Sequence, residues 1–340
     1  MKKFSVGIVG CGEITEGYHL PIFRKIDRLS VSWLCDVNLD RARHLAQRFG
    51  VPHAFGSLQE CPDVDFVLVA TPVGTRRNIL SIIHQRKWHA FCEKPFAVNT
   101  EDHEFMLDGA RANSLVLACG YMRRFYWGTR MAARFVQTMF DTGELHLVGS
   151  DSGRMKRSFH GGNWYLTNPA ASGGGFLMET GSHLIDQMLS IVGADEVVIE
   201  SSAQQKVGHV DFETIAAGFI RDRAGRRIDF DFALSRLRDL WTGIAVDSGP
   251  KTLAINLSPD SPIVLTNSIQ KTRCSFPAPL GARVELVAAY TAQIIQFTDR
   301  IDECDVIGNP AATGILTTQF LSECYRRQSS ASECCAEERL

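Results

Sequence analysis

The sequence has few of the features that mark membrane, nucleic-acid-binding or disulfide-linked proteins. Its apolar stretches are all shorter than the ~20 residues that a membrane-spanning helix needs. Lysine and arginine number 36 against 38 acidic residues, a net charge of −2 that favours neither nucleic acid nor an anionic membrane surface as a partner. The ten cysteines include no CxxC pair. We therefore expect a cytoplasmic protein with reduced thiols, no metal site, and no membrane or nucleic-acid partner.

The strongest local signal is the stretch SVGIVGCGEIT at residues 5–15. An apolar run, typical of a buried parallel strand, leads into Gly10 and Gly12, which allow the chain to turn and a ligand to approach the backbone. A helix that begins near Glu13 and Ile14 would direct its unpaired N–H groups and its positive dipole end at the same point. The pattern predicts a binding site for the pyrophosphate of a dinucleotide.

Later strand ends extend this predicted site. A second apolar run ends at Asp36, where a Rossmann fold places the acid that binds the adenosine ribose. Asp36 would accept hydrogen bonds from the ribose 2′-hydroxyl and repel a 2′-phosphate, so NAD is expected in preference to NADP. Another apolar run ends at Thr71-Pro72, and we expect these residues and the following Arg76 to line the cofactor crevice. Thr15 departs from the pattern, since Gly or Ala usually forms its third member.

At 340 residues the chain is long enough for two domains with separate cores. Strand-like and helix-like stretches alternate over residues 3–120, which predicts parallel βαβ units of the α/β class. From Tyr121 onward strand-like runs follow one another, which predicts an α+β domain with an open, mostly antiparallel sheet. Helices are predicted over, among others, residues 13–27, 122–140, 175–191, 283–303 and 310–327. We predict a Rossmann domain over residues 1–121, a substrate-binding and oligomerisation domain over 122–327, and a polar tail over 328–340.

A further strand-like run ends in Glu93-Lys94-Pro95. Because the carboxyl ends of parallel strands share one edge of the sheet, Glu93 and Lys94 are expected beside the nicotinamide end of the cofactor. Dehydrogenation of a secondary alcohol requires loss of the hydroxyl proton as hydride leaves the same carbon, and a lysine ammonium can bind that oxygen. The simpler interpretation of Lys94 is a surface lysine in a loop.

Glu179, His183 and Asp186 are spaced four and three residues apart, so they share one face of the helix predicted over residues 175–191. For an isolated helix, a solvated charged face is the simpler interpretation. However, the run from Ser172 to Gly175 suits close approach to a ligand, and a histidine between two carboxylates is suited to proton transfer near neutral pH. We therefore expect His183 to transfer the proton, with Glu179 beside it.

Several other side chains are candidates for substrate contact. Arg124 lies in an arginine-rich segment, and Arg154, Lys156 and Arg157 form a basic cluster before a long loop. The cluster is either a solvated strand end or a site for the phosphate or carboxylate of a nucleotide sugar or sugar acid. Trp164, in the loop, either packs over a sugar ring or anchors the loop.

The order of these motifs resembles the Gfo/Idh/MocA oxidoreductase family, which includes glucose–fructose oxidoreductase and inositol dehydrogenase. The motifs lie within residues 4–325: the glycine turn, Asp36, Thr71-Pro72, Glu93-Lys94-Pro95, Gly120–Phe125 and the block from Gly173 to Asp186. The resemblance implies NAD(P)-linked oxidation or reduction of sugars and cyclitols, with Lys94 as the catalytic lysine and His183 as the catalytic histidine. It also implies an oligomer formed through the outer face of the second sheet, and we expect a homodimer or homotetramer. Two departures from the family pattern are Glu179, where Asp is usual, and Arg76, where histidine is common.

The sequence therefore predicts an NAD(P)-dependent oxidoreductase that moves hydride between nicotinamide and a secondary hydroxyl or ketone of a sugar, nucleotide sugar or cyclitol. Lys94 and His183 are expected to handle the proton, and Glu179, Trp164 and Arg124 to contact the substrate. Two alternatives are a redox-neutral lyase or glycosidase with tightly bound NAD, and a non-catalytic dinucleotide-binding regulator. The presence of Lys94 and His183 argues against the regulator, which needs neither.

Overall fold

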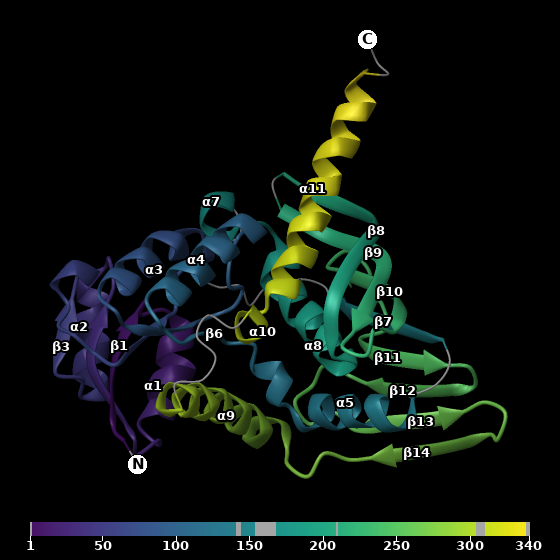
Figure 1. Cartoon of the computed structure of the whole chain (residues 1–340), viewed down its shortest axis with the longest axis horizontal. Helices are drawn as coiled ribbons and strands as arrows, with labels where there is room; N and C mark the ends of the chain where they lie inside the picture. Colours follow the sequence, from purple (N-terminus) through teal and green to yellow (C-terminus); the bar gives the residue numbers. More distant parts are fainter. Residues whose placement is uncertain (1, 141–143, 154–167, 209, 304–309, 338–340) are drawn as a thin grey trace. The chain divides into compact units, whose positions relative to one another are not determined.

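The computed structural model describes the chain at residues 2–140, 144–153, 168–208, 210–303 and 310–337 (Figure 1). The chain divides into two compact units. The first contains Met1–Met122 and Val287–Ile315, and the second contains Arg123–Leu286 and Leu316–Leu340. Each unit is built on a sheet of its own.

The first unit contains a six-stranded sheet with the strand order β3-β2-β1-β4-β5-β6, and all its neighbouring strands are parallel. The strands are β1 (Phe4–Val9), β2 (Leu29–Cys35), β3 (His53–Phe55), β4 (Phe66–Val69), β5 (His89–Cys92) and β6 (Leu117–Cys119). The direction of winding reverses between β1 and β4, and open α/β sheets bind ligands at the carboxyl ends of the strands beside such a reversal. The predicted Rossmann-type sheet is confirmed.

Helices connect these strands. They are α1 (Leu20–Phe23), α2 (Leu39–Phe49), α3 (Arg76–Gln85) and α4 (Thr100–Ala112), with the short helical segments η1 (Thr15–His19), η2 (Leu58–Glu60) and η3 (Val73–Thr75). A further short helix, α10 (Pro310–Thr313), comes from late in the chain and packs near β6. The side chains of Asn38 and Asn99 accept hydrogen bonds from backbone N–H groups in the first turns of α2 and α4. These caps fix where the two helices begin.

The central strands of the first unit's sheet are buried. β4 has the sequence Phe-Val-Leu-Val and is buried at every position, as expected for a parallel strand covered on both faces. Gly7 in β1 makes room for the indole of Trp33, because a Cβ at Gly7 would lie 2.1 Å from Cζ2 of that ring. Trp33 in turn packs against Trp88, with ring centroids 5.9 Å apart.

The long helix α9 (Ala282–Asp302) packs mostly with the first unit. Phe297 lies edge-on against Phe66 and Phe91, with ring centroids 5.2 and 5.5 Å apart. The compact units therefore divide the chain differently from the predicted domain over residues 122–327. The apolar pattern of a helix shows that it packs against something, but not which sheet it packs against.

The second unit contains an eight-stranded sheet with the order β14-β13-β12-β11-β7-β10-β9-β8. The strands are β7 (Leu145–Ser152), β8 (Ala194–Val207), β9 (Val210–Asp222), β10 (Arg227–Ser235), β11 (Gly243–Ser248), β12 (Lys251–Ile255), β13 (Ile263–Asn267) and β14 (Thr272–Phe276). β10 and β7 are parallel, and the other neighbouring strands are antiparallel. The predicted open, mostly antiparallel sheet is confirmed.

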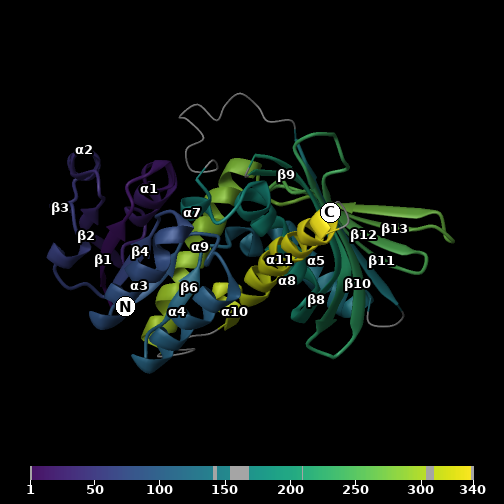
Figure 2. The same cartoon turned by 90° about the horizontal axis from the view of Figure 1, so that it is seen from above.

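Three helices pack against one face of this second sheet, as Figure 2 shows. They are α5 (Trp127–Met139), α8 (Ser182–Val192) and α11 (Ile315–Glu337). Phe320 of α11 packs on Phe230 and Phe232 of β10, with ring centroids 5.4 and 5.3 Å apart. Two short segments, α7 (Pro169–Ser172) and η5 (Leu177–Gly181), precede α8.

The ends of several helices differ from the prediction. The helix predicted over 13–27 is the π-helical turn η1 followed by α1, which ends at Phe23. The helix predicted over 122–140 is divided into the 3-10 turn η4 (Met122–Phe125) and α5.

The C-terminal helix also differs from the prediction. α11 continues to Glu337, beyond the predicted end at residue 327, so the predicted polar tail over 328–340 is helical at 328–337. Those ten residues contain neither glycine nor proline, and nothing in them forces the helix to stop.

Candidate active site

The glycine turn after β1 fits a dinucleotide. Gly10 has a φ of +96°, and a Cβ there would lie 2.4 Å from the carbonyl oxygen of Ala70, so only glycine fits. A Cβ at Gly12 would meet no atom of the chain within 4 Å, which leaves open space beside the turn for a ligand. The first helical hydrogen bond runs from the N–H of Glu16 to the carbonyl of Gly12. The preceding N–H groups, including those of Glu13 and Ile14, have no earlier turn to bond to and are suited to bind phosphate.

Thr15, the unexpected third member of the glycine pattern, is fully buried and stabilises the turn. Its hydroxyl donates to the carbonyl oxygen of Gly10 at 2.6 Å. The extra side chain is therefore accommodated by a hydrogen bond across the turn. Sequence reasoning treated Thr15 only as a departure, because its partner is a backbone atom five residues earlier.

Asp36 lies against the same turn. Its Oδ2 accepts a hydrogen bond from the backbone N–H of Cys11 at 2.7 Å, and its Oδ1 accepts one from Asn38 at 2.9 Å. The structure thus brings Asp36 to the glycine turn from the end of the neighbouring strand β2, as the sequence predicted. A half-buried carboxylate here is suited to accept hydrogen bonds from a ribose.

Lys94 follows β5 at the carboxyl edge of the same sheet and is half-buried. Its backbone N–H donates to Oε2 of Glu93 at 3.1 Å, and the Oε1 atom of Glu93 lies 2.6 Å from Nε2 of His19. Burial raises the pKa of Glu93, but the hydrogen bond and charge of His19 and the charge of Lys94 lower it more, so its pKa lies below the ordinary value of 4.5. The carboxylate is therefore ionised at neutral pH and accepts from both neighbours.

Arg76 was expected to contact the cofactor, but its side chain is buried, with 1% of its surface exposed. Its Nη1 donates to the backbone carbonyls of Glu93, Pro95 and Phe96, and its Nη2 donates to the carbonyl of Thr71 at 3.0 Å. The guanidinium is thus directed at the backbone around Lys94.

Thr71 and Pro72 follow β4 and are both half-buried. The hydroxyl of Thr75 donates to the carbonyl of Pro72 at 2.8 Å, and its oxygen lies 3.1 Å from Oγ1 of Thr71. The turn beside the reversal point is therefore fixed by side-chain hydrogen bonds. Its position at the carboxyl end of β4 is the one that the sequence predicted for a cofactor contact.

In the second unit, Glu179 and His183 lie on consecutive helical segments. Glu179 belongs to the π-helical turn η5 and is half-buried, and His183 is in the first turn of α8 with 9% of its surface exposed. A π turn widens the helix, so the two residues do not have the angular spacing of a plain α-helix. Such turns occur frequently at functional sites.

Asp211 fixes the start of this helix, and sequence reasoning did not identify it. Its carboxylate accepts hydrogen bonds from the N–H groups of Gly175 at 2.8 Å and Leu177 at 2.6 Å, and from the hydroxyl of Tyr325 at 2.7 Å. It thus caps, from β9, the segment that carries Glu179. Burial raises the pKa of Asp211 above its ordinary value, although these hydrogen bonds lower it in part.

The simpler interpretation predicted that Asp186 shares a solvated face with Glu179 and His183, but Asp186 is buried. It is 2% exposed, and Arg124 donates from Nε to Oδ2 at 2.8 Å and from Nη2 to Oδ1 at 2.5 Å. Thr317 donates to Oδ1 at 3.2 Å. Burial raises the pKa of Asp186, and Arg124 lowers it only in part. Arg124, predicted to contact the substrate, therefore binds a buried carboxylate of its own unit.

The remaining predicted substrate contacts fall outside the part of the chain that the structure describes. They are Trp164 and the basic cluster Arg154, Lys156 and Arg157. Among the residues that are described, no group of three or more His, Cys, Asp or Glu side chains could bind a metal ion. In the same part of the chain, no helix combines the length and apolar character needed to cross a membrane.

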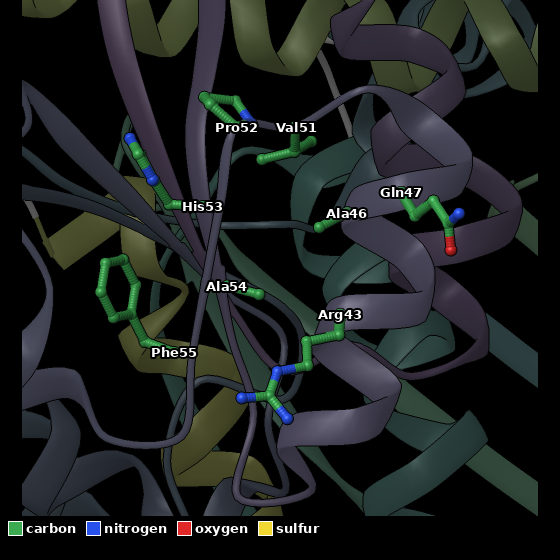
Figure 3. Close-up of a pocket in the computed structure, with 8 residues that line it drawn as sticks. All are labelled: Arg43, Ala46, Gln47, Val51, Pro52, His53, Ala54 and Phe55. Carbon is green, nitrogen blue, oxygen red and sulfur yellow. The ribbon is translucent and has the colours of Figure 1, made fainter.

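A surface hollow of about 410 Å³ lies on the first unit, between α2 and β3 (Figure 3). It is lined by Arg43, Ala46, Gln47, Val51, Pro52, His53, Ala54 and Phe55. None of these belongs to the glycine turn or to the ends of β2, β4 and β5. The hollow adjoins the predicted cofactor site at Phe55, whose carbonyl oxygen accepts a hydrogen bond from the N–H of Asp36 at 3.1 Å.

Two family models match the chain. The NAD-binding Rossmann fold of an oxidoreductase family, GFO_IDH_MocA, matches residues 4–121. The C-terminal alpha/beta domain of the same family matches residues 142–235. Together the two matches cover more than half of the chain, and they follow each other in the order that the sequence predicted.

Curated relatives carry names of dehydrogenases and related proteins. Myo-inositol 2-dehydrogenase of Thermotoga maritima is 32% identical over 35% of this chain and 36% of its own. D-glucoside 3-dehydrogenase of Escherichia coli is 27% identical over 60% of this chain and 58% of its own. The chain therefore spans between about a third and three fifths of the length of these two relatives. The rhizopine catabolism protein MocA of Rhizobium meliloti is 25% identical over 86% of this chain and 93% of its own.

Solved structures share the whole fold. KijD10, a 3-ketoreductase from Actinomadura kijaniata in complex with NADP and TDP-benzene, has a TM-score of 0.77 and 18% identity over 94% of this chain and 96% of its own. An oxidoreductase from Agrobacterium radiobacter in complex with NAD+, L-tartaric acid and magnesium has a TM-score of 0.77 and 16% identity over 96% of each chain. These structures share the fold, and the two family models show that the chain belongs to the Gfo/Idh/MocA oxidoreductase family.

Proposed function

We propose that the protein is an NAD(P)-dependent oxidoreductase that transfers hydride between nicotinamide and a secondary hydroxyl or ketone of a sugar, nucleotide sugar or cyclitol. One observation carries the proposal: a lysine fixed on both sides at the carboxyl end of β5, in the unit whose glycine turn and Asp36 fit a dinucleotide. The names of two relatives, myo-inositol 2-dehydrogenase and D-glucoside 3-dehydrogenase, support the substrate class.

The cofactor, when bound, supplies the carbon that accepts or donates hydride. The residues of the chain bind it and handle the proton. The N–H groups that follow Gly12 bind the pyrophosphate, and Asp36 binds the adenosine ribose. The ammonium of Lys94 donates hydrogen bonds to the substrate oxygen, where negative charge grows as its proton leaves.

His183 accepts that proton during oxidation and returns it during reduction. Glu179 contacts the substrate beside it. The hydrogen bonds of Asp211 to Gly175 and Leu177 fix the start of the segment that carries both residues. Positioned in this way, a general base contributes about 10²–10⁴-fold to the rate.

The test is a screen of sugars, cyclitols and nucleotide sugars, followed by the absorbance of reduced nicotinamide. The expected result is stoichiometric reduction of NAD by at least one compound class, with Lys94→Met as the inactive control. Product formation without net reduction of added cofactor would instead indicate a redox-neutral lyase or glycosidase. Tight binding of NAD with no turnover of any compound would indicate a dinucleotide-binding regulator.

The partner that we propose is a second copy of the chain, in a homodimer or homotetramer. The face of the second sheet opposite α5, α8 and α11 carries apolar side chains, including Ile215, which is 43% exposed, and the half-buried Val148 and Phe219. Burying such a face is a common reason for association. Light scattering should give a mass well above 37.7 kDa at micromolar concentration, and a mass near that value would contradict the proposal.

A further inference from the structure

One buried side chain, that of Arg76, donates hydrogen bonds to several backbone carbonyls around Lys94. Arg76, in the first turn of α3, donates to the carbonyl oxygens of Glu93 and Pro95, which immediately precede and follow Lys94. It also donates to the carbonyl of Phe96 at 3.2 Å and to that of Thr71, at the end of β4, at 3.0 Å. The same guanidinium thus ties the Lys94 loop to the turn beside the reversal point.

This arrangement depends on arginine. A guanidinium is always charged and presents five N–H donors in a rigid plane, so it can serve several carbonyls at once. A neutral imidazole, the side chain common at this place in the family pattern, has only one N–H to donate. Burying a charged group is costly unless its hydrogen bonds are made, and here backbone carbonyls accept from Nη1 and Nη2, whereas the buried Nε has no hydrogen-bond partner among the described residues.

The other side of Lys94 is also fixed. Oε2 of Glu93 accepts from the backbone N–H of Lys94, while Oε1 lies 2.6 Å from His19. The Lys94 main chain is therefore held at its own N–H by Glu93 and at both flanking carbonyls by Arg76. These contacts fix the direction in which the Lys94 side chain leaves the backbone.

We propose that Arg76 is a positioning residue for Lys94: its buried guanidinium fixes the backbone on both sides of the lysine and so sets where the ammonium lies. This proposal rests on the proposed function, since it takes Lys94 as the group that binds the substrate oxygen. With 1% of its surface exposed, Arg76 is assigned to act through Lys94 and not by direct binding of substrate or cofactor. Misplacement of a catalytic group by about 1 Å can cost on the order of 10²-fold in rate.

The test combines Arg76→Met with Lys94→Met in a double-mutant cycle, followed by single-turnover hydride transfer. Arg76→Met alone should lower the rate by about 10–100-fold and change the NAD dissociation constant by less than about threefold. In the Lys94→Met background the same substitution should have little further effect, because groups that act as a unit are not additive. Equal effects in both backgrounds would overturn the proposal.

Arg77→Met is the matched control. Arg77 is the next residue of α3, it is 40% exposed, and it binds the carboxylate of Asp102. The control removes the same charge from the same helix without touching the Lys94 loop. It should leave the rate near that of the parent protein.

A second measurement does not depend on activity. Amide hydrogen exchange over residues 93–98 should be about tenfold faster or more in Arg76→Met, and unchanged in Arg77→Met. If exchange is faster in Arg76→Met but Lys94→Met is fully active, the proposed function is refuted and the role of Arg76 in positioning the loop remains intact. Unchanged exchange would overturn the positioning role whatever the rates. If Arg76→Met does not fold, Arg76→Lys replaces it: exchange over residues 93–98 faster than in the parent is expected, and unchanged exchange would overturn the positioning role.

Discussion

Replacing Glu93 with Gln tests the buried pair of Glu93 and His19, which lies next to Lys94. In the parent protein Oε1 lies 2.6 Å from Nε2 of His19, and Oε2 accepts from the N–H of Lys94 at 3.1 Å. A carboxylate can accept from both groups, whereas glutamine has one acceptor oxygen and turns an NH₂ group toward the other donor. The variant should therefore leave one buried donor unsatisfied, which costs about 1–3 kcal/mol of unfolding free energy.

The effect should depend on pH. The pKa of Glu93 is lowered below its ordinary value of 4.5 in the folded protein. A depressed pKa means that the carboxylate stabilises the fold above the unfolded-state value and that this contribution is lost as pH falls through the folded-state pKa. Glutamine does not titrate, so the difference in stability between Glu93→Gln and the parent should be largest near neutral pH and shrink below 4.5.

The assay is urea unfolding of both proteins at neutral pH and at a series of acidic values. Glu101→Gln is the control, because the Glu101 side chain is 86% exposed and lies 3.7 Å from Arg77 at the surface. It should change stability by less than about 0.5 kcal/mol. A neutral-pH stability of Glu93→Gln equal to that of the parent, or a difference that stays constant into acid, would refute the reasoning.

Three further predictions concern the cofactor turn and the second unit. Titration should show that the parent binds NAD at least about tenfold, or 1.4 kcal/mol, more tightly than NADP. Asp36→Ala should remove this preference. Equal affinities of the parent for the two cofactors would count against the assigned role of Asp36. Gly12→Val should weaken NAD binding by at least about tenfold and leave the unfolding midpoint near that of the parent, because a Cβ at Gly12 meets no atom of the described residues within 4 Å. Gly10→Ala should lower the unfolding free energy by about 1–3 kcal/mol, because a Cβ at Gly10 collides with Ala70. Asp211→Asn should lower the unfolding free energy by about 1–3 kcal/mol and also lower kcat, with NAD affinity retained; an unchanged kcat would mean that this cap does not position the helix.

The parts of the fold and site that could be predicted from the sequence depend on local patterns. Gly10 and Gly12 lie between an apolar strand and a helix within a single stretch, and Asp36 ends the next apolar run. Neighbouring strands of a parallel sheet end at one edge, so the meeting of Asp36 with the turn follows from the alternation of strands and helices alone.

The contacts that could not be predicted join residues far apart in the sequence. His19 meets Glu93 across 74 positions, and Asp211 reaches Leu177 across 34. Neither His19 nor Asp211 belongs to a motif, and nothing beside them in the chain indicates a partner. Arg76 was predicted to line the cofactor crevice, and its contacts with the Lys94 loop were missed, because its hydrogen bonds go to backbone carbonyls, which carry no sequence signal.

The charged residues of the second unit show a different limit. Spacing alone placed Glu179, His183 and Asp186 on one helix face. The π turn changes the angle between the first two, and Arg124 draws the third into a buried ion pair. Helical periodicity assumes a regular helix with one solvent-facing side, and α8 is buried almost all round.

The most direct test of the central claim is the turnover of Lys94→Met and His183→Asn alongside their affinity for NAD. The cofactor contacts assigned to Gly12 and Asp36 involve neither residue, so both variants should bind NAD as the parent does. Both should turn over substrate at least about 10²-fold more slowly, since each removes a proton-handling group. Lys25→Met, at an exposed lysine of the first unit, should keep the turnover and the NAD affinity of the parent. If either Lys94→Met or His183→Asn works at the parent rate, that residue has no part in the chemistry and the proposed mechanism is wrong.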